Sequence, residues 1–249
     1  MFNFDYMEKD SFASWFDSPY YHVLYKNRDD NEAEKFITNI TNHLQLPKKS
    51  RLLDLACGKG RHSVTLHKLG YDVVGVDLSP NSINAATQYS KDLLEFRVHD
   101  MREAMSNEKF DGILNLFTSF GYFDSMEDNR RVIQAMYTML REKGVLVIDF
   151  MNATNVINSL VLKEVKVVDN ITFNIQRKFD GKHIFKNIQF TAENKSFNYT
   201  ERVQAIRSGD FHELLTQNGF QILCTFGDFD LSPFEEKKSD RLIIVAQRK

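Results

Sequence analysis

The sequence predicts an α/β fold in which helices cover both faces of a mainly parallel sheet and an antiparallel β meander is inserted late in the chain. Between Leu52 and Met151, short apolar runs alternate with amphipathic segments. Strands that are apolar throughout are typical of a parallel sheet covered on both faces. After Met151, apolar and polar residues alternate, which is typical of antiparallel strands with one solvated face. At 249 residues and 42% hydrophobic content, residues 1–249 are predicted to form a single domain.

The chain is predicted to begin with helix. A helix is expected over residues 11–46, with a break near Ser18-Pro19, because apolar residues between positions 36 and 44 recur at helical spacing. Pro47 ends this run, since proline cannot continue a helix.

Five parallel strands with helices between them are predicted next. The strands are "LLDL" (52–55), "DVVGVD" (72–77), "LEFRVHD" (94–100), "DGILNLF" (111–117) and "GVLVIDFM" (144–151). Helices are expected at about 62–69, from the Ser79-Pro80 pair onward, and at about 126–143, where Gly144 stops the last of them.

The antiparallel meander is predicted for residues 160–205. Its strands are "VKVVD", "ITFNIQRKF", "IFKNIQFTA" and "SFNYTERVQAI", with a hairpin turn at Asp180-Gly181. A helix, "GDFHELLTQNGF", then stops at Gly219. The closing strands "FQILCTFGDF" and "DRLIIVAQR" are expected to pair as an antiparallel hairpin at the edge of the parallel sheet.

The link between the first strand and the first helix, Asp54 to Gly60, is the main functional motif. Glycines there let the backbone approach a ligand, and the following helix offers free N–H groups. Asp77 ends the second strand, 17 residues after Gly60, where a carboxylate can accept both hydroxyls of a ribose. The motif therefore indicates a nucleoside-containing ligand at the carboxyl ends of parallel strands.

Three details narrow the class of ligand. The dinucleotide fingerprint needs a third glycine, but Ser63 follows Gly58 and Gly60. Asp54 lies just before the glycines, where it repels a pyrophosphate and attracts an ammonium group. Asp100, at the end of the third strand, is placed to accept from an adenine amine. These acids favour a cationic nucleoside without phosphates, such as S-adenosylmethionine.

The segments "LLDLACGKGRHS", "VVGVDLS", "FRVHDM", "FDGILNLFTSFGYF" and "LREKGVLVIDF" resemble, in order and spacing, the motifs of class I S-adenosylmethionine-dependent methyltransferases. The resemblance covers Leu52 to Met151, with weaker support from the closing strands. It implies a Rossmann-like seven-stranded sheet of order 3-2-1-4-5-7-6, with the seventh strand antiparallel. It also implies that residues 1–46 form a lid and that the meander at 160–205 roofs the active site, as in the small-molecule branch of the family.

The resemblance further implies which residues hold S-adenosylmethionine. The expected set is Asp54, Gly58 and Leu116 for the methionine part, with Gly60 allowing close passage; Asp77 for the ribose; Leu78, Asp100 and Met101 for the adenine; and Tyr21, Ala56 and Arg61 around them. Many family members have glycine at the position of Ala56. Arg61 has a second interpretation, a solvent-facing residue of the first helical turn.

Candidate catalytic residues come from two segments. "FTSFGYF", Phe117 to Phe123, follows the fourth strand, and Ser119 and Tyr122 carry hydroxyls that can orient an acceptor. In the N-terminal segment, His22 is a candidate general base because an unperturbed imidazole titrates near neutral pH. A structural role for His22 remains open.

Composition limits the remaining possibilities. The net charge of −2 shows no basic surplus, so nucleic acid is not the expected partner. No group of residues has metal-ligand spacing, and neither a signal peptide nor a membrane span is recognisable, so a cytoplasmic protein is expected. The hypothesis is methyl transfer to an O- or N-nucleophile of a small molecule. The alternatives are a methyltransferase acting on tRNA or protein, a nicotinamide-dependent oxidoreductase, and a non-catalytic S-adenosylmethionine-binding protein.

Overall fold

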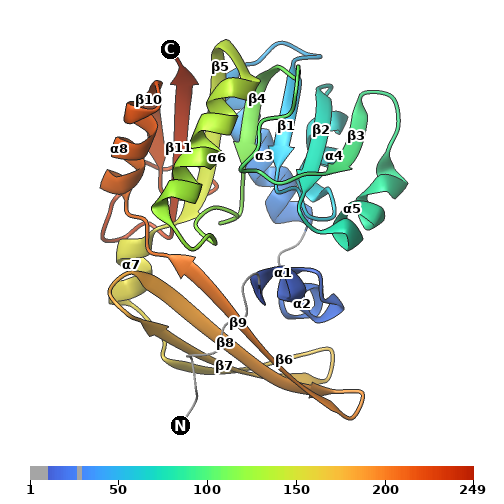
Figure 1. Ribbon diagram of the computed structural model, residues 1–249, viewed down its shortest axis with the longest axis vertical. Helices are drawn as coiled ribbons and strands as arrows, with labels where there is room; N and C mark the ends of the chain where they lie inside the picture. Colours follow the sequence, from blue (N-terminus) through green and yellow to red (C-terminus); the bar gives the residue numbers. More distant parts are fainter. Residues whose placement is uncertain (1–10, 27–29) are drawn as a thin grey trace.

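The computed structural model describes residues 11–26 and 30–249, which form two β-sheets stacked end to end (Figure 1). The larger sheet has seven strands and the smaller one four. The strands of the larger sheet are β1 (Arg51–Leu55), β2 (Asp72–Asp77), β3 (Leu94–Val98), β4 (Phe110–Asn115), β5 (Leu140–Met151), β10 (Phe220–Phe226) and β11 (Arg241–Arg248).

The order of the larger sheet confirms the predicted topology. The strands run β3-β2-β1-β4-β5-β11-β10. The first five are parallel, and β11 is antiparallel to both of its neighbours, β5 and β10. Since β10 and β11 are the sixth and seventh strands of this sheet in chain order, the order is the expected 3-2-1-4-5-7-6. The closing hairpin lies at the sheet edge, as predicted.

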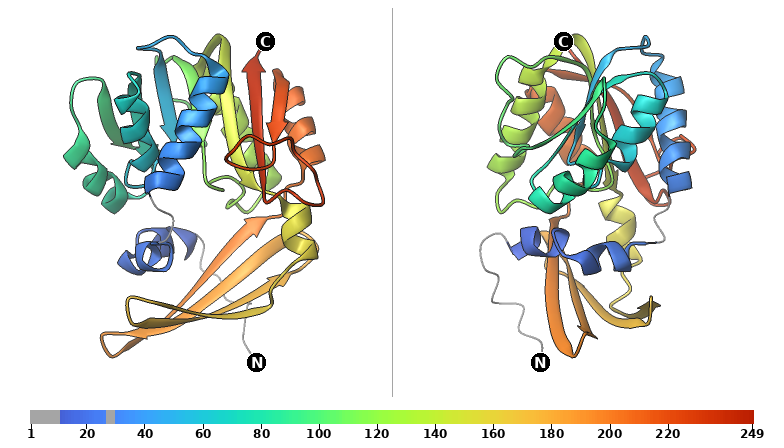
Figure 2. Two further views of the ribbon diagram at one scale, coloured as in Figure 1. Left: turned by 180° about the vertical axis from the view of Figure 1, so that it is seen from behind. Right: turned by 90° about the vertical axis from the view of Figure 1, so that its right-hand side faces the viewer.

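Helices cover both faces of the larger sheet, so its apolar strands are buried on both sides (Figure 2). The helices are α3 (Asp30–Leu44), α4 (Arg61–Lys68) and α5 (Pro80–Ala86) on one face, with the short η1 (Thr87–Tyr89) after α5, and α6 (Met126–Met139) and α8 (Ser208–Gln217) on the other. Ser79 caps α5 through its Oγ, which accepts from the Ser82 N–H at 3.0 Å, and Pro80 occupies the first helical position. Both features match the predicted start of this helix.

The smaller sheet is the antiparallel meander. It consists of β6 (Lys163–Val168), β7 (Ile171–Phe179), β8 (His183–Ala192) and β9 (Lys195–Gln204), each paired with the next along the chain. Gly181, with φ +99°, lies in the predicted turn between β7 and β8. The short helix α7 (Ala153–Asn158) links β5 to this sheet.

Several boundaries differ from the sequence prediction: β3 ends at Val98 rather than at Asp100, for example, and β4 at Asn115 rather than at Phe117. The N-terminal helix is divided into α1 (Ser11–Phe16), α2 (Pro19–Leu24) and α3; Ser18 caps α2, which confirms the break near Ser18-Pro19. Helix α6 ends at Met139 rather than Lys143, because Leu140 is extended (φ −74°, ψ 146°) and pairs with Phe110 of β4. Strand β5 therefore starts before Gly144.

The carboxyl ends of β1, β2, β4 and β5 face the smaller sheet, and α1 and α2 lie between the two sheets (Figure 1). Trp15 and Leu24 of these helices pack in a buried cluster with Phe173, Ile188 and Phe190 of the smaller sheet. No helix within residues 11–26 and 30–249 is long and apolar enough to cross a membrane.

We predict that Gly75→Ala destabilises the larger sheet. A Cβ at this position of β2 would lie 2.6 Å from the Phe96 ring and 2.8 Å from Ser63 Oγ. Overpacking of this kind costs about 1–3 kcal/mol. In thermal unfolding this corresponds to a lower Tm, by roughly 2–4 °C for each kcal/mol. The matched control is Gly209→Ala in α8, where a Cβ meets no atom within 4 Å, so its Tm should not fall. Equal Tm values for Gly75→Ala and wild type would contradict the packing described.

Candidate functional site

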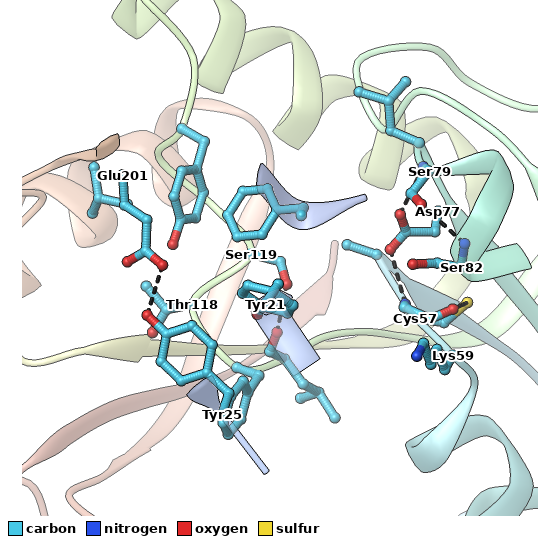
Figure 3. Close-up of a pocket in the computed structure, with 18 of the residues that line it drawn as sticks. Tyr21, Tyr25, Cys57, Lys59, Asp77, Ser79, Ser82, Thr118, Ser119 and Glu201 are labelled. Carbon is cyan, nitrogen blue, oxygen red and sulfur yellow. Dashed lines mark hydrogen bonds between the residues drawn. The ribbon is translucent and has the colours of Figure 1, made fainter. Parts of the chain in front are cut away.

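A cavity of about 740 Å³ lies between the two sheets, a size in the usual range for small-molecule sites. The carboxyl ends of β1 to β4 form its floor, α1 and α2 one wall, and the inner face of β7 to β9 its roof. Figure 3 shows Asp77 at one end of the cavity, Tyr25 and Glu201 at the other, and Tyr21 and Ser119 between them.

The loop after β1 presents its backbone to the cavity. Ala56, Gly58 and Arg61 all line it. Ala56 has φ +67° and Gly58 φ +56°, a left-handed backbone that explains why glycine is common at the position of Ala56. A Cβ added at Gly58 would meet no protein atom within 4 Å, so this glycine faces open space. Gly60 does not line the cavity; a Cβ there would lie 2.6 Å from the Phe96 ring, so this glycine permits internal packing rather than ligand passage.

Asp77 faces the cavity at the end of β2 and accepts backbone hydrogen bonds on both of its oxygens. Gly58 N–H donates to Oδ2 at 2.8 Å, and Ser79 N–H donates to Oδ1 at 2.9 Å, while the Leu78 amide adds a further interaction. A carboxylate has about four acceptor positions, so it can still accept from a ribose hydroxyl. Burial raises the pKa of Asp77 above its ordinary value of 3.8, against the opposing effect of these backbone donors.

Asp54 lies behind the glycine loop and does not line the cavity. Its carboxylate is buried and accepts a hydrogen bond from Ser63 Oγ at 2.6 Å. Burial raises the pKa of Asp54 to about 6, and the charge of nearby Asp77 adds to this, while the Ser63 hydroxyl opposes it. In this structure Asp54 therefore acts on the cavity through its field and through the loop, not by direct contact.

The predicted adenine contacts lie together at the end of the cavity beside Asp77. Leu78, Asp100 and Met101 all line it, and Leu78 is 43% exposed. Arg102 forms a bidentate ion pair with the Asp100 carboxylate, with Nε 3.1 Å from both oxygens and Nη2 2.6 Å from Oδ2. Burial acts to raise the pKa of Asp100, but Arg102 outweighs it and keeps this pKa below its ordinary value.

The N-terminal helices close the cavity from the side. Tyr21 and His22 of α2 line it, and Asp17 accepts hydrogen bonds from Ser79 and Asn81 beside the ribose end. Burial, with the charge of Lys59, lowers the pKa of His22 to about 4. His22 is therefore neutral at physiological pH and a weak base.

The turn after β4, Leu116 to Ser119, lines the centre of the cavity. Phe117 has φ +68° and Thr118 φ +59°. A left-handed backbone is rare in a β-branched residue such as threonine, and such strain amounts to about 1–3 kcal/mol per residue. Ser119 Oγ donates to the Leu116 carbonyl at 2.8 Å, and Tyr122 also lines the cavity. All three catalytic candidates thus face the same cavity.

The roof carries a row of charges that the sequence interpretation missed. Arg177 of β7, Lys186 of β8 and Glu201 of β9 are direct cross-strand neighbours, and all three line the cavity. Tyr25 Oη and Trp15 Nε1 donate to Glu201 Oε1 at 2.6 and 2.7 Å.

The cations of this row have partners as well. Lys186 Nζ is 3.9 Å from Glu201 Oε2 and donates to Tyr25 Oη. Arg177 Nη2 is 2.5 Å from Glu164 Oε2.

The sequence contains a signal for this row. The inner face of each strand is apolar except at one position, so that Ile175, Arg177 and Phe179 alternate on β7. Lys186 between Ile184 and Ile188, and Glu201 between Tyr199 and Val203, interrupt β8 and β9 in the same way. A charge in the apolar phase of three successive strands indicates a polar site on the inner face of a sheet. Lys59, inside the glycine loop, is a further cavity residue that the sequence interpretation did not identify.

The residues present fit an adenosyl amino acid. Asp77 offers acceptors for a ribose, Leu78 an exposed apolar surface for a base, and Gly58 open space over a loop of backbone groups. The part of the same cavity that lies under the charged row is lined by Arg177, Lys186 and Glu201.

Comparison with known proteins agrees with this geometry. A family model described as "Methyltransferase domain" matches residues 46–219. The chain is 28% identical over 229 residues to a glycine/sarcosine N-methyltransferase of Aphanothece halophytica, covering 89% of this chain and 83% of that protein.

Solved structures show the same fold. An S-adenosylmethionine-dependent methyltransferase from Clostridium acetobutylicum superposes with a TM-score of 0.78 at 22% identity, covering 92% of this chain and 96% of that one. CalS10 from Micromonospora echinaspora, an amino pentose methyltransferase solved with S-adenosylmethionine bound, gives a TM-score of 0.71 at 19% identity, covering 93% and 98%.

We predict that Asp77→Asn weakens the binding of S-adenosylmethionine and S-adenosylhomocysteine by roughly 10- to 100-fold, the value of one or two charge-assisted hydrogen bonds. Because its pKa is raised, Asp77 is protonated at a higher pH than an ordinary aspartate. Wild-type affinity should therefore fall as the pH drops through that raised pKa, while the Asn variant shows no such dependence. Isothermal titration calorimetry at several pH values measures both effects. Unchanged affinity in the variant would contradict the ribose role of Asp77.

Proposed function

The chain belongs to the methyltransferase domain family and is an S-adenosylmethionine-dependent methyltransferase of small molecules, and we propose that its acceptor is a small amine that also carries an acidic group. The observation that carries this proposal is the charged row of Arg177, Lys186 and Glu201, which lines the cavity at the end away from Asp77. Because the family model that matches this chain describes a methyltransferase domain, the alternative of a nicotinamide-dependent oxidoreductase has no support.

The candidate bases that line the cavity, His22 and Glu201, are weak or already hydrogen-bonded, and this favours nitrogen as the acceptor atom. A neutral amine attacks through its own lone pair, whereas a hydroxyl needs a base to take its proton during transfer. His22, with a pKa of about 4, is a weak base. Glu201 already accepts hydrogen bonds from Trp15 and Tyr25. The relative from Aphanothece halophytica is named for two amine acceptors, glycine and sarcosine, which supports the same choice.

The acidic group is assigned to the roof. Lys186 is only 15% exposed and lies on a sheet face that is apolar apart from Arg177 and Glu201. A buried cation there gains from an anionic ligand, because the ligand adds charge-assisted hydrogen bonds in a medium of low dielectric. Arg177, its neighbour across β7 and β8, has the planar donor group that suits a carboxylate. Both cations lie on the side of the cavity opposite the floor that holds the cofactor.

The protein's part in the reaction is mainly positional. S-adenosylmethionine, when bound, supplies a methyl group on a sulfonium sulfur that is already activated for displacement. Asp77 and the glycine loop anchor the cofactor, and the roof cations orient the acceptor above the Leu116–Ser119 turn. Helices α1 and α2 cover the junction and exclude water, so the reactants meet in a fixed geometry. On this basis we interpret α1 and α2 as the lid and residues 160–205 as the roof. The lid expected over residues 1–46 is therefore shorter, because α3 packs on the larger sheet, and residues 1–10 and 27–29 lie outside the described residues.

We predict that Lys186→Met lowers kcat/KM for an acidic amine by roughly 10- to 100-fold, through loss of one charge-assisted hydrogen bond. Methyl transfer is measured with three sets of compounds: glycine and β-alanine, their amides, and the matching hydroxy acids. Wild type should prefer the amino acids, and the variant should lose its preference over the amides. Lys178→Met, on the opposite face of β7, is the matched control and should retain the preference.

Two results would overturn the proposal. If wild type methylates the amides as well as the amino acids, the acidic group is not recognised. If the hydroxy acids are the better acceptors, nitrogen is the wrong acceptor atom.

A further inference from the structure

We propose that Asp149 and Arg241 are positioning residues for methyl transfer: they hold the turn from Leu116 to Ser119 in its strained form, and this turn aligns the acceptor with the methyl group. The inference extends the proposed function. It needs only that the chain transfers a methyl group to a small molecule, whether or not the acceptor is an acidic amine.

Asp149 binds both strained residues of the turn. It lies near the end of β5, and its side chain is fully buried. Its Oδ2 accepts from the Phe117 N–H at 2.8 Å, and its backbone carbonyl accepts from the Thr118 N–H at 3.0 Å. One residue thus receives the amides of two successive residues in the left-handed conformation, which defines the path of the turn.

Arg241 completes the connection from the other side. It is the first residue of β11, and the antiparallel pairing of β11 with β5 places it opposite Met151, at the cavity edge of the sheet. Its Nε donates to Asp149 Oδ1 at 2.8 Å, and its Nη2 donates to Thr118 Oγ1 at 3.0 Å. The two oxygens of Asp149 are therefore divided between the turn and Arg241.

The location of these contacts indicates a role beyond stability. A buried ion pair is often no more stabilising than apolar residues of the same size. Strained backbone persists where surrounding groups determine it, and it concentrates at functional sites. Here Phe117, Thr118 and Arg241 all line the cavity, beside the charged row and the glycine loop. The sheet order that brings β4, β5 and β11 together thus links the C-terminal strand to the centre of the site.

The test compares Arg241→Lys, Arg241→Met and Thr118→Gly in the full-length protein. Lysine retains the charge but cannot donate in two directions as the guanidinium does. We therefore expect kcat to fall in the order wild type, Arg241→Lys, Arg241→Met, with a loss of about 100-fold in the last, the effect of a misplacement of about 1 Å. The affinity for S-adenosylhomocysteine should fall far less than kcat in all of them, because Asp77 and the glycine loop are intact and only the expected Leu116 contact lies in the turn.

Thr118→Gly distinguishes an effect of the strained turn on kcat from a general loss of stability. Glycine adopts φ near +59° without strain, and this gain offsets the lost hydrogen bond to Arg241 and the greater freedom of glycine in the unfolded chain, so the Tm of this variant should stay close to that of wild type. Its kcat should nevertheless fall, because the turn is free to leave the aligned conformation and the bond to Arg241 is lost. Hydrogen exchange gives a measurement that needs no acceptor: the Phe117 and Thr118 amides should be protected in wild type and exposed in Arg241→Met.

Two control variants make the same kinds of change, but away from the cavity. Lys143→Gly removes a left-handed residue (φ +58°) at the opposite end of β5. Arg141→Met removes an ion pair with Asp111, 2.7 Å long, at that same end. Both should leave kcat unchanged.

The outcomes separate this inference from the proposed function. The inference is overturned if Arg241→Met keeps wild-type kcat, if its kcat and cofactor affinity fall together with its Tm, or if the turn amides stay protected. Turnover is measured with whichever acceptor of the amine and hydroxyl panel wild type methylates. Methylation of hydroxyls alone would defeat the proposed amine acceptor but leave the expected order of the Arg241 variants intact.

Discussion

Parallel strands end at the same edge of a sheet, and this constraint places the cofactor half of the site. β1, β2, β3 and β4 each end within reach of one cavity, so the glycine loop, Asp77, Asp100 and the Leu116–Ser119 turn converge although they are distant in sequence. Backbone groups at these ends are not all paired within the sheet. Asp77 binds the amides of Gly58 and Ser79, which ties β2 to the loop after β1 and leaves the carboxylate facing the cavity.

The edge formed by the carboxyl ends of the parallel strands must be covered before it can hold two reactants away from water. The antiparallel sheet and the N-terminal helices cover it. Trp15 and Tyr25 join the two through Glu201, while Asp17 joins α1 to the loop beside Asp77. The same set of contacts that closes the cavity therefore connects its Asp77 end to its Glu201 end.

Sequence patterns were sufficient for the sheet and for bringing most of the residues proposed to bind the cofactor to one cavity. Apolar runs ending in Asp77 and Asp100 predict strands whose last residues share one edge, and the cavity contains both. The sequence did not reveal that Asp54 and Gly60 lie behind the loop, because their positions depend on packing with Ser63 and Phe96. The end of α6 was misplaced for a similar reason: the pairing of Leu140 with β4 overrides the glycine signal.

The acceptor half was harder to predict because it is assembled across strands. Arg177, Lys186 and Glu201 are neighbours only once the meander has its register, although each interrupts an apolar alternation that is visible in the sequence. Arg241 gave no local signal, since its role depends on the antiparallel placement of the last strand beside β5.

The central claim is that cofactor and acceptor meet over the turn that follows β4. A crystal structure with S-adenosylhomocysteine bound tests it most directly. The account predicts ribose hydroxyls within hydrogen-bond distance of Asp77 and a sulfur atom that faces the Leu116–Ser119 turn and the part of the cavity below the charged row. A ligand bound elsewhere, or a sulfur atom turned away from that part of the cavity, would contradict it.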